Sequence, residues 1–192
     1  MRKAAILRKT KETDIVLELD LDGSGNAEID TGIGFFDHML TALAVHGKLD
    51  LKVTCKGDLE VDGHHTVEDI GIALGKALAE ALGDKKGIER FGCAYVPMDE
   101  ALARCVLDLS GRAYLCFDAR SLTGMIGSYD AALTEEFFTA VCSNAFINAH
   151  IDELRGRNAH NVCEAIFKSF ARALKLAKEI TGSSVLSTKG SL

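Results

Sequence analysis

Side chains in the first half of the chain alternate between apolar and polar, which is the pattern of strands with one buried face. In one such stretch Leu49, Leu51, Val53 and Cys55 occupy every second position and therefore share a face. The alternation predicts strands at residues 4–9, 15–21, 26–30, 49–56 and 58–62.

Apolar residues recur at helical spacing in two longer stretches of the same half. The first covers residues 35–45 and is followed by Gly47, and the second covers residues 66–82 and is followed by Gly83. Glycine lacks a Cβ and suits the left-handed conformation in which helices end. We therefore predict one helix in each stretch.

The second half of the chain repeats this order of patterns. The predicted elements are strands at 93–97, 101–109 and 112–119, a helix at 135–149, a strand at 149–154 and a helix at 159–180. Ser110 and Gly111 predict a tight turn that joins the second and third of these strands. Residues 181–192 are rich in glycine and serine and predict a surface tail that a ligand can order.

The two longest predicted helices begin with related motifs. His160 and Glu164 follow His64 and Glu68 at the same separation, 96 positions (160 − 64 and 164 − 68). Gene duplication with fusion explains this repeat economically. We expect two half-domains, residues 1–90 and 91–192, that form one compact unit.

Composition narrows the function classes. Of the 192 residues, 47% are hydrophobic, enough for a proper core, and the net charge of −6 argues against a nucleic-acid binder. The six cysteines form no Cys-x-x-Cys motif, which favours a reduced, intracellular protein. No segment approaches the roughly 20 apolar residues of a membrane span, so we expect a cytoplasmic protein.

The histidine and glutamate pairs are candidate metal ligands. Residues four apart on a helix project from one face, so His64 with Glu68, and His160 with Glu164, can bind one cation apiece. His65 points about 100° away and must serve a different site. A lone histidine is more often structural, but imidazole with carboxylate suits Mn²⁺, Fe²⁺ or Co²⁺. The spacing predicts two metal sites that exchange ligands between related halves.

These motifs identify a family resemblance that covers essentially the whole chain. The sequence resembles the imidazoleglycerol-phosphate dehydratases, di-manganese enzymes of histidine biosynthesis. The matching segments are Arg8 to Thr13, Phe36 to Leu40, Asp62 to Asp69, Gly87 to Gly92, Met98 to Leu102, Asp108 to Arg112, Glu164 to Lys168 and Ser187 to Gly190.

The resemblance implies two Mn²⁺ sites with different ligand sets. The first set is His38, His65, His160 and Glu164. The second set is His64, Glu68, Glu136 and Asn161. Family members carry histidine where Asn161 stands, and many also do where Glu136 stands. An amide oxygen is a weaker donor than imidazole, so we expect the second site to bind metal more weakly or to complete its shell with water.

The resemblance also implies the reaction and the groups that serve it. The substrate would be D-erythro-imidazole glycerol phosphate and the product imidazole acetol phosphate, with the imidazole ring held between the two cations. The implied catalytic residues are Glu12, His65 and Glu164. The implied substrate-binding residues, mostly for the phosphate, are Arg90, Arg112, Lys168, Ser187, Lys189 and His46. His150 matches no role, and packing is the better interpretation.

The fold implied by the resemblance is α+β. Each half would be a four-stranded sheet with helices packed on one face, as in domain 2 of ribosomal protein S5. The family also implies trimers that assemble into a cubic 24-mer, with the phosphate pocket assembled between subunits. Two alternatives stay open: a divergent paralogue with a weakened second metal site that acts on another phosphorylated azole, and a non-catalytic metal-stabilised assembly.

Overall fold

A computed structural model of the chain describes residues 2–190 and 192, so position 191 of the predicted tail and position 1 of the first half lie outside the described residues. The elements of the first half are β1 (Lys3–Lys9), β2 (Thr13–Asp20), β3 (Ala27–Asp30), α1 (Gly34–Gly47), β4 (Asp50–Gly57) and α2 (His64–Leu82). Those of the second half are β5 (Phe91–Met98), β6 (Ala101–Asp108), β7 (Tyr114–Asp118), β8 (Met125–Ile126), β9 (Tyr129–Asp130), α3 (Leu133–Ala145), β10 (Asn148–Arg155) and α4 (Ala159–Ala177).

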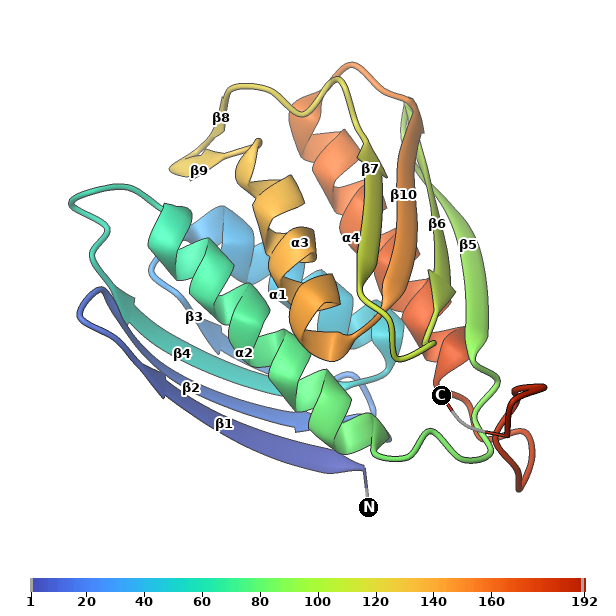
Figure 1. Cartoon of the computed structure of the whole chain (residues 1–192). Coiled ribbons are helices and arrows are strands. Elements are labelled where there is room, and N and C mark those ends of the chain that lie inside the picture. Colours follow the sequence, from blue (N-terminus) through green and yellow to red (C-terminus); the bar gives the residue numbers. More distant parts are fainter. Residues whose placement is uncertain (1, 191) are drawn as a thin grey trace.

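The two halves build matching sheets. The first sheet has the strand order β1-β2-β4-β3 and the second β5-β6-β10-β7, and in each the last two strands named are parallel while the other pairs are antiparallel. The four helices lie between the two sheets, so each sheet has one covered face and one open face (Figure 1). The predicted α+β fold, with a four-stranded sheet and helices on one face in each half, is confirmed.

The hydrophobic core fills the space between the sheets. Strand β2 buries every second residue from Thr13 to Leu19, as its alternating sequence predicts. Aromatic side chains from α3 and α4 meet at the centre, where the ring centroids of Phe137 and Phe138 both lie within 5.3 Å of that of Phe167. Tight packing of this kind holds the helices in fixed positions relative to each other.

Two sequence predictions about strands are wrong. Residues 58–62 form turns and not a strand, because the acidic side chains and Gly63 favour a turn, and Val61 N–H bonds to the carbonyl of Asp58 at 2.8 Å. The turn at Ser110 and Gly111 does not join neighbouring strands. Strand β10 lies between β6 and β7, so the chain at 109–113 crosses the end of β10.

The predicted helices exist, with shifted ends. Helix α3 covers 133–145 instead of 135–149, because Phe146 adopts the left-handed conformation that ends it. Helix α4 ends at Ala177 and not at residue 180. The short hairpin of β8 and β9 was not predicted, since two-residue strands leave no periodic pattern.

Among the described residues, no helix is both long enough and apolar enough to cross a membrane.

Candidate metal centre and anion pocket

The helices run in parallel pairs and begin at one end of the molecule (Figure 1). A Cβ added to Gly71 of α2 would lie 2.8 Å from the Cβ of Ala140, and one added to Gly75 would lie 2.7 Å from that of Asn144, so α2 and α3 run in the same direction in close contact. The predicted ligands on α1, α2, α3 and α4 all lie in the first two turns of their helices. Helix N-termini carry partial positive charge, which favours carboxylates and anions there.

Three predicted ligands converge at this end. His38 of α1 and His160 of α4 place their Nε2 atoms 3.6 and 3.3 Å from the same oxygen, Oε2 of Glu164. The ligating atoms of these three residues all lie within 4.8 Å of one another. Helix α4 is held in place by Asn158, whose side chain accepts the N–H of His160 at 2.9 Å. The local spacing supplies the His160–Glu164 pair, and the packing of α1 against α4 adds His38.

Glu164 is buried, and its surroundings favour the ionised carboxylate, the form that can bind a cation. Burial by itself would raise the pKa of Glu164, but the hydrogen bond and charge of Lys168 and then the histidines His38 and His160 lower it below its ordinary value. Lys168 Nζ lies 2.6 Å from Oε1 of Glu164. The other oxygen, Oε2, therefore faces the two histidines. The donor set of two imidazoles and one carboxylate fits a divalent transition metal.

His65 belongs to a separate group. Its Nδ1 lies 3.0 and 3.2 Å from the two carboxylate oxygens of Asp58, and its Nε2 lies 3.8 Å from Oε1 of Glu12. The hydrogen bond to Asp58 and the charge of Glu12 raise the pKa of His65. Glu12, the predicted acid/base residue, and His65, a predicted metal ligand, are thus neighbours. His65 is not part of the group formed by His38, His160 and Glu164.

The remaining predicted ligands are not gathered into one group among the described residues. His64 Nε2 lies 3.8 Å from Oε2 of Glu68, and Glu136 lies exposed in the first turn of α3. The amide nitrogen of Asn161 donates to Oε2 of Glu100 at 2.8 Å. This bond and that from the backbone of Asn158 lower the pKa of Glu100 to about 2. A carboxylate only accepts, so this bond uses the amide nitrogen of Asn161 and leaves its carbonyl oxygen as the donor atom for a cation.

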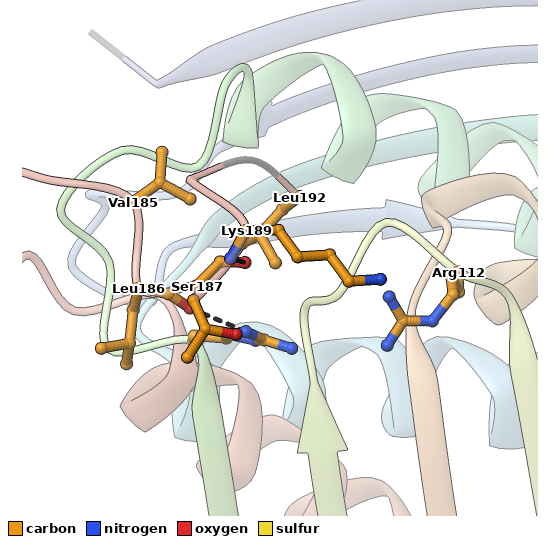
Figure 2. Close-up of a pocket in the computed structure, with 8 residues that line it drawn as sticks. Arg112, Val185, Leu186, Ser187, Lys189 and Leu192 are labelled. Carbon is orange, nitrogen blue, oxygen red and sulfur yellow. Dashed lines mark hydrogen bonds between the residues drawn. The ribbon is translucent and has the colours of Figure 1, made fainter.

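A pocket of about 630 Å³ lies in the second half, beside the C-terminal tail of residues 181–192. Its lining residues are Arg90, Arg112, Val185, Leu186, Ser187, Thr188, Lys189 and Leu192. Figure 2 shows the side chains of Arg112 and Lys189 extending toward the same part of the pocket. Four of the predicted phosphate-binding residues therefore lie together within one chain, and their cationic groups and hydroxyl suit an anion.

Arg90 anchors the tail to this pocket. Its Nε donates to Oδ1 of Asp108 at 2.7 Å, its Nη2 to Oδ2 at 3.1 Å, and its Nη1 to the carbonyl of Leu186 at 2.7 Å. The two bonds to Asp108 raise the pKa of Arg90, so it stays charged. The lining of the pocket does not include Lys168, which pairs with Glu164 in the described part of the chain.

His46, the other predicted pocket residue, lies half-buried in the last turn of α1. Burial, followed by the charges of Lys168 and Arg172, lowers the pKa of His46. His150 lies exposed on β10, with its ring centroid 6.0 Å from that of Tyr114.

Sequence reasoning missed three carboxylates that contact predicted site residues, namely Asp58, Glu100 and Asp108. Glu100 and Asp108 lie inside the motifs quoted above for the family resemblance, and Asp58 directly follows β4. An acidic residue at the end of a strand, close in sequence to a histidine pair, was the available signal for Asp58.

Comparisons with known proteins agree on one family. Residues 31–174 match the model of the imidazoleglycerol-phosphate dehydratase family. A relative of that name from Polaromonas sp. is 55% identical over 194 residues, which covers all of this chain and 94% of the relative. Another from Clostridioides difficile (strain 630) is 54% identical over 192 residues and is covered completely, as is this chain.

Solved structures give the same result. The chain is similar to the imidazoleglycerol-phosphate dehydratase of Staphylococcus aureus subsp. aureus N315, with a TM-score of 0.85 and 43% identity over 93% of this chain and 99% of that one. It is also similar to the enzyme of Pyrococcus furiosus in complex with (S)-C348, with a TM-score of 0.84 and 37% identity over 97% of this chain and all of that one.

Proposed function

This chain belongs to the imidazoleglycerol-phosphate dehydratase family, and we propose that it dehydrates its substrate at a cation site formed by His38, His160 and Glu164. The enzyme class predicted from the sequence, a hydro-lyase of histidine biosynthesis, is confirmed by the match of family and relatives. The reaction converts D-erythro-imidazole glycerol phosphate to imidazole acetol phosphate.

The observation that carries the proposed site is the convergence of three donor atoms on one point. The Nε2 atoms of His38 and His160 lie 3.6 and 3.3 Å from Oε2 of Glu164, separations that one divalent ion with ligand distances of about 2.1 Å can bridge, because two such ligands can be up to about 4.2 Å apart. A cation bound there would stabilise negative charge on the imidazole ring of the substrate. We propose Mn²⁺ as that cation, with His65 as a further ligand.

Glu12 is the proposed proton carrier. Dehydration removes a hydroxyl from the carbon beside the ring and a proton from the next carbon, and the resulting enol becomes the ketone. A carboxylate with access to solvent can accept the proton and return one. The Glu12 side chain is 52% exposed, and its Oε1 lies 3.8 Å from His65. This exposure and the nearness of His65 support the proposed role of Glu12.

The proposed phosphate site is the pocket beside the tail. Arg112 and Lys189 supply charge, Ser187 supplies a hydroxyl, and Arg90 adds charge while it holds the tail. We also assign Lys168 to the substrate site, and its bond to Glu164 supports a position at the ring end of the substrate. His46, near the other end of α1, completes the proposed set.

The second cation site is proposed to be weak. His64 and Glu68 supply a pair of donors, and Glu136 adds a carboxylate from α3. The amide nitrogen of Asn161 donates to Glu100, so that position offers a cation only the carbonyl oxygen, a weaker donor than imidazole. Metal analysis after extensive dialysis tests this: we expect one tightly held Mn²⁺ per chain, and a second after Asn161→His. Two ions of equal affinity in the wild type would refute it.

The assembly and location are also proposals. We infer that two half-domains, 1–90 and 91–192, form one compact unit, and that copies of the chain assemble, with a cubic 24-mer as the family expectation. Within one chain, His65 and Glu12 lie apart from His38, His160 and Glu164. This separation supports a cation site shared between subunits, in which His65 of one chain joins the other three ligands of a neighbouring chain. We propose the cytoplasm as the location.

One assay tests the function as a whole. Purified protein is incubated with the imidazole triol phosphate and Mn²⁺, and the ketone product is measured. We expect turnover in the range of ordinary enzymes, about 1 to 10³ per second, and its loss in His160→Gln. Binding of Mn²⁺ without turnover would instead support the alternative, a metal-stabilised assembly.

A further inference from the structure

Asp58, which has no assigned role, contacts both His65 and Glu12. Its carboxylate lies 3.0 Å from Nδ1 of His65, and its backbone N–H donates to the carbonyl of Glu12 at 3.1 Å. The two contacts come from one residue. The relative position of Glu12 and His65 is therefore set through Asp58.

The chain is shaped to bring Asp58 to this place. Gly57, the last residue of β4, packs so closely against the first turn of α2 that an added Cβ would lie 2.0 Å from Oγ1 of Thr66. Gly57 also pairs with Thr13 in the sheet. The end of β4 is thus fixed between the Glu12 loop on one side and the His65 turn on the other.

The chemistry of the contact decides the state of the ring. An ionised carboxylate can only accept a hydrogen bond, so Nδ1 of a neutral His65 must carry the proton. The lone pair of the ring then lies on Nε2, the nitrogen that faces Glu12 at 3.8 Å. Carboxylates that orient histidine ligands in this way are common around metal ions.

We propose that Asp58 is a positioning residue, which holds His65 in the tautomer that presents the Nε2 lone pair to a divalent cation beside Glu12. The role of His65 as a cation ligand rests on the proposed function. The tautomer does not depend on that function, since it is set in the metal-free protein.

The first test reads the tautomer directly. Protein with ¹⁵N in its histidine rings is examined metal-free, at a pH above the titration of His65, by magic-angle-spinning NMR, and the His65 signal is assigned by its absence in His65→Gln. We expect a protonated Nδ1 in the wild type and a mixture of both tautomers in Asp58→Ala. Asp58→Asn keeps an accepting oxygen and should lie between them. The wild-type tautomer in Asp58→Ala would overturn the proposal.

The second test measures Mn²⁺ affinity by calorimetry. We expect Asp58→Ala to weaken binding about 10- to 100-fold and Asp58→Asn to weaken it less. The matched control Asp14→Asn removes a charge from an exposed position on β2 and should leave the affinity unchanged. Wild-type affinity in Asp58→Ala would refute the positioning role. Wild-type affinity in His65→Gln would instead show that His65 is no ligand, so the assignment of His65 in the proposed function would fail.

Discussion

The pair of Glu164 and Lys168 allows a quantitative test of the proposed metal centre. We consider Glu164→Gln, which keeps the shape of the side chain and removes its charge. The two charged atoms lie 2.6 Å apart, and the side chains of Glu164 and Lys168 are only 7% and 18% exposed. The substitution therefore leaves a largely buried ammonium group without its partner.

The expected cost follows from this burial. Removing one partner of a fully buried pair costs about 3–5 kcal/mol, and the residual exposure of Lys168 lowers our expectation to about 2–3 kcal/mol. The free energy of unfolding of the metal-free protein is measured in urea for Glu164→Gln, Lys168→Met and the double variant. We expect a coupling energy of about 1.5 kcal/mol or more.

Lys9 and Asp14 provide a matched control for the cycle. Their charged atoms are also 2.6 Å apart, but their side chains are 76% and 50% exposed. An exposed pair should couple by about 0.5 kcal/mol or less. Equal coupling in the two cycles would refute the argument from burial.

Manganese adds a second measurement on the same variants. A cation that binds the folded state stabilises it in proportion to the logarithm of its concentration relative to Kd. Loss of the Glu164 charge should weaken binding at least about tenfold, which lowers the Mn²⁺-dependent stabilisation by about 1.4 kcal/mol. Equal stabilisation of Glu164→Gln and wild type by Mn²⁺ would exclude Glu164 as a ligand.

Three further predictions concern other parts of the molecule. Arg112→Met should raise KM for the phosphate substrate about 10- to 100-fold with little change in kcat, as steady-state kinetics would measure, because a charged hydrogen bond contributes about 1.5–3 kcal/mol. The pKa of His46 is lowered in the folded state, so the unfolded chain binds the proton first as the pH falls. The contribution of neutral His46 to stability is therefore complete above about pH 6.5 and decreases below it. Urea unfolding at pH 7.5 and at pH 5.0 should show that the free energy of unfolding decreases less between these pH values in His46→Asn than in the wild type. Gly71→Ala would place a Cβ 2.8 Å from the carbonyl of Phe137, so unfolding should reveal a loss of about 2 kcal/mol, whereas Gly34→Ala, with no atom nearby, should be close to neutral.

The duplicated fold was largely predictable because its signals are local. Alternation in β2 and helical spacing in α2 and α4 depend only on residues near in sequence. The His160–Glu164 pair was predictable for the same reason, since a helix places residues four apart on one face. Strand order was not local, and the predicted turn at Ser110 and Gly111 was wrong because β10, distant in sequence, lies between β6 and β7.

The sequence by itself therefore determined most of the elements, the duplication, the family and the kinds of donor that the protein presents. Only the tertiary structure decided which donors meet. His38 reaches His160 because α1 packs beside α4, and Asp58 and Glu100 reach His65 and Asn161 because a strand end and a turn pack against helix starts. The contacts of His38 with His160 and of Glu100 with Asn161 join residues far apart in the chain, and close packing of the whole core, which no local pattern encodes, fixes their distances.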